Sequence, residues 1–261
     1  MNCKICESVS PAFGSAVIMD KYSISYYRCP NCGFVQTEEP YWLNEAYSRP
    51  INISDTGIMA RNIFNANIVS GILKLCFKSD GKFADYGGGY GIFVRIMRDK
   101  GFDFYRDDKY CANLFANGFD IADSGANHFE LLTAFEVFEH FVSPSEELEK
   151  LLQKSDSILF TTEIMPANQF QPSEWWYYGL NHGQHISFYT YNALKYLANK
   201  FQLRYLTRNN LHLFSRKNDK ALKVKFVLAT DFYLSHVIQL MARKASLTCR
   251  DSKMFTGKDI V

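Results

Sequence analysis

The stretch "GKFADYGGGYGIFVRIMRDKGFDFYRDD", residues 81–108, decides the fold of this chain. It predicts a short strand over 82–86, a glycine-rich turn, a helix over 92–100 and a second strand over 103–107. This order forms a βαβ unit, which opens a parallel sheet. Glycines let the backbone turn sharply and let a ligand touch the main chain near the helix N-terminus. The stretch therefore predicts an α/β domain with a ligand-binding turn.

Two classes of cofactor use such a turn, and the spacing of the glycines distinguishes them. The dinucleotide fingerprint GxGxxG would require a glycine at position 92, but residue 92 is Ile and the preceding residue is Gly91. The residues from Asp85 to Gly91 read DxGxGxG instead. With this pattern the chain resembles the class I S-adenosylmethionine-dependent methyltransferases.

The resemblance implies a fold and a set of cofactor-binding residues. The fold is a doubly wound, mostly parallel seven-stranded α/β sheet of the Rossmann-like methyltransferase type. The acid that ends the first strand and the glycines of the turn would hold the methionine part of the cofactor. The acid after the second strand would bind the ribose hydroxyls, since a carboxylate can accept two hydrogen bonds from a diol. Carried over by position, these residues are Asp85, Gly87, Gly89 and Gly91, and then Asp108, with Asp107 as the alternative.

The segment "NHFELLTAFEVFEHF" continues the pattern downstream. It predicts a strand over 130–135 followed by Glu136, Glu139 and His140, and it resembles the EVLEH segment that ends the fourth strand of many of these methyltransferases. Glu136 and His140 alone could form an ordinary i, i+4 pair. Open α/β sheets bind their ligands at the carboxyl ends of the strands, so lining of the cofactor site by Glu136 is favoured. The next predicted strand ends near Glu163, which points a second carboxylate at this edge.

An aromatic run, "WWYYGLNHGQHISFY" at 175–189, follows that strand. Any one of its rings could be core packing, but a loop here passes over the reactive end of the cofactor. The run resembles the "GQHVSFYS" segment of methyltransferases from polysaccharide, deoxysugar and secondary-metabolite pathways. Flat aromatic faces suit a sugar ring or a base. The predicted substrate-binding residues are Trp175, Trp176, Tyr177 and Tyr178.

Chemistry at oxygen requires a proton acceptor, because a hydroxyl nucleophile has to lose its proton. Histidine has a pKa near neutrality and is the usual choice. The predicted base is His185, with His182 second and Glu163 as the group that orients the imidazole or binds a substrate hydroxyl. A histidine bonded to a loop carbonyl for structural reasons is the alternative reading. Sugar C-methyltransferases of this kind are longer, with a further C-terminal domain, so O-methylation is favoured.

The cysteines near the N-terminus predict a metal site. Two CxxC pairs, separated by 22 residues, point four thiolates at one centre in the manner of a structural zinc ribbon. The predicted ligands are Cys3, Cys6, Cys29 and Cys32. Redox-active pairs are the alternative, but Pro30 and Gly33 suit a metal knuckle. Several of the resembling methyltransferases also carry an N-terminal cysteine ribbon.

The composition bounds the remaining possibilities. No apolar run approaches the roughly 20 residues of a membrane span, the N-terminus shows no secretory signal, and a cytoplasmic location is expected. A net charge of +2 makes nucleic acid an unexpected partner.

Four segments are predicted: a zinc ribbon at 1–45, a linker and helix at 46–78, a cofactor domain at 79–215 and a helical extension at 216–261. The extension is expected to cover a sheet edge or to join a homodimer, with contact to a membrane surface or an acidic partner as the alternative.

Three functions therefore remain open at this stage. The favoured one is methylation of a sugar or sugar nucleotide, for a surface polysaccharide or a secondary metabolite. A second is methylation of nucleic acid or protein, with the ribbon as the docking module. The third is a non-catalytic scaffold built from the ribbon and an inactive cofactor fold.

Overall fold

The computed structural model describes residues 1–52, 55–166, 168, 171–229 and 244–258. They form two compact units that interleave along the chain. The first unit contains residues 1–52, 134–153 and 159–216, and the second contains 53–133, 154–158 and 217–261. The predicted segment boundaries at 45, 78 and 215 stay predictions, and each unit is described by itself.

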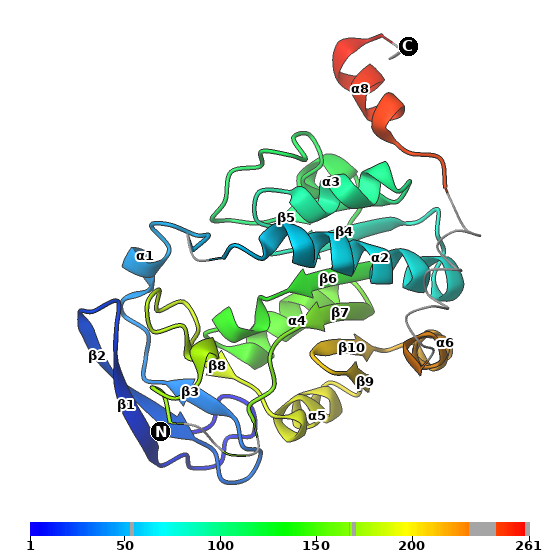
Figure 1. Cartoon of the computed structure of the whole chain (residues 1–261). Coiled ribbons are helices and arrows are strands. Elements are labelled where there is room, and N and C mark those ends of the chain that lie inside the picture. The colour runs from blue at the N-terminus through cyan, green and yellow to red at the C-terminus, as the bar shows by residue number, and fades with distance from the viewer. Residues whose placement is uncertain (53–54, 167, 169–170, 230–243, 259–261) are drawn as a thin grey trace. The chain divides into compact units, whose positions relative to one another are not determined.

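A four-stranded sheet lies in the first unit, in the order β1-β2-β3-β8 (Figure 1). Strand β1 (Ala12–Ile18) pairs antiparallel with β2 (Tyr22–Arg28), and β2 pairs with β3 (Val35–Thr37). Strand β8 (Ser187–Phe188) then pairs antiparallel with β3, which joins the end of the aromatic run to the cysteine-bearing segment.

The core of this unit is aromatic, because the inward positions of these strands carry large rings. Tyr26 meets Tyr178 edge-to-face at a centroid distance of 5.2 Å, and Tyr178 lies 4.5 Å from Phe188. Trp42 precedes the short helix α1 (Leu43–Ala46) and donates from Nε1 to the carbonyl of Gly183 at 2.7 Å. Rings that pack at such distances add to the stabilisation from burial. The hydrogen bond from Trp42 to Gly183 and the packing of Tyr178 therefore hold the loop before β8 at two points.

The six strands of the larger sheet are ordered β5-β4-β6-β7-β10-β9 among the described residues. Strand β4 (Lys82–Tyr86) pairs in parallel with β5 (Asp103–Asp107) and with β6 (Leu131–Phe135). The other members are β7 (Ser157–Thr161), β9 (Arg204–Arg208) and β10 (Leu211–Ser215), of which β9 and β10 are antiparallel. The predicted mostly parallel α/β sheet is confirmed, with six strands described where seven are expected.

Helices of the second unit run beside β4 and β5 (Figure 1). Helix α2 (Ile58–Cys76) contacts α3 (Ile92–Asp99) and α6 (Asn218–Ala229), while α3 packs on β5. Apolar residues occur along the whole of α2, but the buried ones, among them Val69, Ile72 and Leu73, lie mostly in its C-terminal half. The first unit includes α5 (Tyr191–Lys200) and all but the last residue of α4 (Pro144–Lys154).

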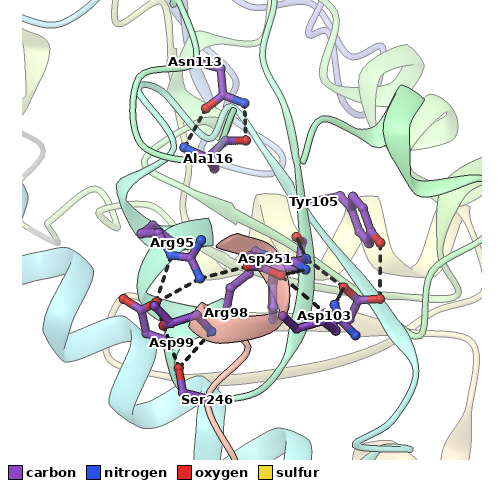
Figure 2. Close-up of polar contacts among 12 residues, drawn as sticks. Arg95, Arg98, Asp99, Asp103, Tyr105, Asn113, Ala116, Ser246 and Asp251 are labelled. Carbon is purple, nitrogen blue, oxygen red and sulfur yellow. Dashed lines mark hydrogen bonds and ion pairs between the residues drawn. The ribbon is translucent and has the colours of Figure 1, made fainter. Parts of the chain in front are cut away.

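The last helix, α8 (Thr248–Thr256), is fastened to α3 by an ion-pair network (Figure 2). Asp251 accepts from Nε and Nη2 of Arg98 at 2.8 and 2.9 Å, a bidentate pair in which both residues are buried. The Arg98 guanidinium also donates to Asp103 at 2.7 Å and stacks 3.6 Å from the centroid of Phe119. Bidentate pairs fix geometry as well as charge. Helices α6 and α8 lie in the segment predicted as a helical extension, and residues 230–243 of that segment lie outside the described residues.

Candidate active site

The glycine-rich turn connects β4 to α3 within the second unit. Gly87, Gly89 and Gly91 have φ angles of +68°, +54° and +87°, and Gly91 is the N-cap of α3. These left-handed angles favour glycine, because a Cβ atom costs roughly 1–2 kcal/mol there. A Cβ at Gly91 would also lie 2.8 Å from Oδ1 of Asn113. The pattern DxGxGxG thus forms the close backbone turn that it predicts.

Two side chains, one near the end of β5 and one directly after it, hold this turn in place. Oδ2 of Asp108 accepts from the N–H of Gly89 at 2.9 Å, and Oδ1 accepts from the N–H groups of Tyr110 and Cys111, both at 2.8 Å. Arg106, which is buried, donates to the carbonyl of Gly89 at 2.6 Å. Two carboxylate oxygens have about four acceptor positions, and three of them are used here. Ribose binding by Asp108 stays a prediction, with one acceptor position remaining for it.

The alternative ribose ligand, Asp107, is engaged in a different way. Its Oδ2 accepts a hydrogen bond from the ammonium group of Lys154. Its backbone carbonyl accepts from the N–H of Gly87 at 2.8 Å. Asp107 therefore supports the turn through its main chain, while its side chain forms an ion pair.

Asp85, at the base of the turn, is buried and only 3% exposed. Its Oδ1 accepts from Oγ1 of Thr133 at 2.6 Å. Burial raises the pKa of Asp85 to about 7, and the nearby Asp108 charge adds to this rise while Thr133 opposes it. A buried carboxyl whose ionised form is disfavoured suits a cationic ligand, because an opposite charge restores the ionised form. The fit of Asp85 to an ammonium group is therefore good.

Glu136 follows β6 and belongs to the first unit. Its φ angle is +53°, an uncommon value for a residue with a side chain. Oγ1 of Thr161 donates to its Oε1 at 2.7 Å and accepts from its N–H at 3.0 Å, which holds this conformation. Backbone strain of this kind concentrates at functional sites. The predicted role of Glu136 in cofactor binding stays a prediction.

Three histidines of the first unit form a cluster, which we call the histidine cluster: His140, His182 and His185. The rings of His140 and His185 lie 4.9 Å apart, and those of His182 and His185 lie 4.7 Å apart, as centroid distances. Nδ1 of His185 lies 2.6 Å from the carbonyl of Tyr177, and Nδ1 of His140 lies 3.0 Å from the carbonyl of Gln184. The sequence predicts two of these residues in a site, and the fold adds His140.

The protonation of the histidine cluster follows from burial and from these bonds. Burial lowers the pKa of His140 and of His182 to about 4, and it lowers that of His185 well below the ordinary value, helped by the two neighbouring rings. All three imidazoles are therefore neutral at pH 7. A carbonyl only accepts, so His140 and His185 carry their proton on Nδ1 and keep the Nε2 lone pair. His182 carries its proton on Nε2 instead, because its Nδ1 accepts from the N–H of Gln184 at 3.1 Å.

Glu163 accepts from Nδ2 of Asn210 at 3.1 Å, and its backbone N–H donates to the phenol oxygen of Tyr177 at 3.1 Å. That phenol also lies 3.2 Å from Oγ1 of Thr162 and donates to Oε2 of Glu136 at 3.5 Å. Tyr177 thus links the ends of two strands. The orientation of a histidine by Glu163 stays a prediction.

The predicted substrate-binding rings differ sharply in exposure. Trp175, Tyr177 and Tyr178 are 9%, 1% and 0% exposed and pack in the aromatic core, whereas Trp176 is 76% exposed. Packing of the first three rings in the aromatic core keeps the loop in its conformation. Trp176 is the ring of this run that a ligand could reach, and substrate contact stays a prediction.

The four predicted zinc ligands come together in the first unit. Their sulfur atoms all lie within 4.8 Å of one another, with Sγ of Cys3 3.6 Å from that of Cys32 and Sγ of Cys6 3.3 Å from that of Cys29. The N–H of Cys32 donates to Sγ of Cys29 at 3.4 Å, a bond that suits a thiolate. The other three cysteines are scattered, so the two CxxC pairs form the cluster that their spacing predicts.

Several residues that support the site could not be identified from the sequence. Arg106 and Thr133 lie within strands, where alternation marks them only as strand residues. Glu139 is recognised as part of a motif, but its complete burial is visible only in the fold, where its exposure is 0%. Their contacts are long-range, so no local pattern could have indicated them.

Comparison with known proteins agrees with this architecture. Residues 59–208 match the family model described as "Methyltransferase domain", which is more than half of the 261 residues. The chain belongs to this family of methyltransferase domains. Its enzyme class is that of the S-adenosylmethionine-dependent methyltransferases, as the glycine turn predicts. A search of the curated proteins finds no match.

Among solved structures, the chain is similar to three methyltransferases at low identity. The plantazolicin methyltransferase BpumL, in complex with a monoazolic analogue and S-adenosylhomocysteine (SAH), is 15% identical over 77% of this chain and 88% of that one, with a TM-score of 0.49. An O-methyltransferase family 2 protein from Planctomyces limnophilus with apigenin is 11% identical, with 66% of each chain covered and a TM-score of 0.42. Human N-acetylserotonin methyltransferase with S-adenosylmethionine (SAM) is 13% identical over 68% and 66%, also at 0.42.

No helix in the described part of the chain has the length and apolar character needed to cross a bilayer.

Proposed function

We propose that this methyltransferase acts at oxygen on a small polar substrate, a sugar or a sugar nucleotide. The observation that carries the proposal is the histidine cluster, in which a neutral His185 keeps its Nε2 lone pair while Nδ1 is held by the Tyr177 carbonyl at 2.6 Å. A hydroxyl nucleophile needs such an acceptor. The exposed ring of Trp176 supports a planar or sugar-like ligand beside the loop.

The residues of the turn would bind the cofactor at its methionine end. Asp85 fits an ammonium group, and the positive-φ glycines have no side chain that would prevent close approach of a ligand to the backbone. When bound, S-adenosylmethionine supplies an electrophilic methyl group on a sulfonium. The chain itself then has to orient a hydroxyl and remove its proton, and orientation alone supplies several kcal/mol. His185 is the proposed acceptor, because His182 already uses its Nδ1 lone pair on Gln184.

Zinc is the proposed occupant of the four-cysteine cluster. Four thiolates complete a tetrahedral site and leave no open position, so the ion would stabilise the first unit and take no part in catalysis. Four sulfur atoms within 4.8 Å of one another suit this role, since zinc at about 2.3 Å from each sulfur separates them by about 3.8 Å.

The test combines a substrate screen with a histidine variant. Incubation with SAM and a panel of nucleotide-linked sugars should give a product heavier by one methyl group. His185→Ala should lower kcat by about 100-fold or more and leave SAH affinity within about twofold, while the half-exposed His128→Ala serves as the control. Unchanged turnover in His185→Ala would reject the base assignment. A panel with no methylated sugar, together with SAM-dependent labelling of RNA or protein, would replace the substrate class.

A further inference from the structure

Glu139 and the histidine cluster contain a second group of donor atoms that the base assignment does not explain. One carboxylate oxygen of Glu139 and one ring nitrogen each from His140 and His185 all lie within 4.8 Å of one another. Glu139 is fully buried. Its Oε2 accepts from Oγ1 of Thr162 at 3.2 Å, whereas its Oε1 has no hydrogen-bond partner among the described residues. A buried carboxylate oxygen without a partner is costly and calls for an explanation.

The two histidines are held in the way that metal ligands are held. In metal sites, a ligating imidazole usually donates its other N–H to a carbonyl or carboxylate, which fixes the tautomer and the orientation of the ring. His140 and His185 each direct Nδ1 at a backbone carbonyl, at 3.0 and 2.6 Å. Both Nε2 lone pairs are therefore available, and both come from rings that cannot rotate freely. His182 differs, because its Nδ1 is the acceptor.

We propose that Glu139, His140 and His185 form a binding site for a divalent transition cation, separate from the four-cysteine cluster. Two imidazoles and one carboxylate are a ligand set used for such ions, and three protein ligands leave a coordination position open. Ligand bonds of about 2.1 Å require the donor atoms to approach one another, which movements of about 1 Å achieve. His140 and His185 keep a small part of their surface exposed, whereas Glu139 is fully buried.

The open position gives the site a role in the proposed function, on which this last step rests. A divalent cation lowers the pKa of an oxygen ligand that it binds. A substrate hydroxyl at this position would therefore ionise more readily. With an ion bound, His185 would be one of its ligands and the hydroxyl proton would pass to solvent water. Without the ion, Nε2 of His185 would take that proton, as in the proposed function.

The experiment measures binding alone, without substrate or cofactor. The full chain is first loaded with one equivalent of zinc, which fills the thiolate site. Cobalt(II) is then titrated in and followed by calorimetry and visible absorption. We expect one further equivalent to bind without a thiolate-to-cobalt charge-transfer band. Glu139→Gln should weaken this binding by more than about 10-fold, because loss of even an outer partner of a metal ligand costs about 10–100-fold.

Two further variants guard against misfolding and adventitious binding. His140→Gln should weaken cobalt binding in the same way as Glu139→Gln. The partly exposed His128→Gln should bind cobalt like the wild type. The proposal is overturned if the zinc-loaded wild type binds no second ion, if Glu139→Gln binds it equally well, or if the absorption band shows cobalt on thiolate. None of these results depends on methyl transfer, so failure of the cation site leaves the proposed function to its own test.

Discussion

The glycine turn and the histidine cluster satisfy their buried polar groups in opposite ways. In the turn, Asp108 accepts three backbone N–H groups and Arg106 donates to the carbonyl of Gly89, so side chains and main chain complete one another. Beside the histidine cluster, Glu139 has a carboxyl oxygen with no hydrogen-bond partner among the described residues, and His185 keeps its Nε2 lone pair. A turn completed by its own chain presents backbone to a ligand, whereas the cluster offers reactive lone pairs. The glycine turn is therefore suited to binding a ligand, and the histidine cluster is suited to accepting a proton or coordinating an ion.

The difference extends to what holds each region together. The turn is supported by the parallel strands β4 and β5 and by helix α3, all of which are close in sequence. The histidine cluster depends on β8, whose pairing with β3 ties it to the cysteine-bearing segment. Loss of the metal proposed for that segment should therefore damage the cluster far more than the turn.

The largest effect is expected from removal of a zinc ligand. Cys32→Ser replaces a buried thiolate and should abolish zinc binding, which in small zinc domains contributes on the order of 10 kcal/mol of folding free energy. Metal analysis and thermal unfolding measure this, with the exposed Cys249→Ser as the matched control. We expect a chain that lacks the thiolate-bound zinc and unfolds at a much lower temperature. A Cys32→Ser protein as stable as the control would break the proposed dependence of the first unit on metal.

A smaller effect, confined to the turn, is expected from a single methyl group. Gly91→Ala places a Cβ at φ +87°, 2.8 Å from Asn113 and 3.1 Å from the backbone nitrogen of Ala116. The turn must shift, so SAH affinity should fall by at least about 10-fold, which corresponds to about 1.4 kcal/mol. Gly71→Ala in α2 is the matched control, because a Cβ there meets nothing within 4 Å. Equal affinity in the two variants would show that the cofactor does not depend on this turn.

The same contrast explains what the sequence could predict. The turn, its flanking strands and the four-cysteine cluster follow from spacing along short segments, and the structure contains each of them. The cluster of Glu139, His140 and His185 brings together residues about 45 positions apart. Of these three residues only His185 was predicted as a site residue, as a candidate base. Pairing of β3 with β8 joins segments about 150 residues apart, for which neither strand carries a local signal.

The aromatic run is a second case in which the sequence did not determine the arrangement of the side chains. Its composition predicts rings beside a substrate, yet Tyr177 and Tyr178 are buried in the core and Trp176 is exposed. Ring content alone does not indicate which face of a loop each residue takes, because the loop has no fixed period. The sheet of the first unit packs against three of the four rings, Trp175, Tyr177 and Tyr178, and therefore determines which rings are buried.

The most direct test of cofactor binding at the glycine turn is a calorimetric titration of the wild-type chain with SAH between pH 6 and pH 8. The pKa of Asp85 is raised to about 7 in the free protein, and an ammonium group beside it would lower that pKa, so binding releases a proton. One equivalent should bind, and its affinity should rise about 10-fold from pH 6 to pH 8 and then level off. Absence of any heat of binding, or an affinity that falls as the pH rises, would contradict cofactor binding at Asp85.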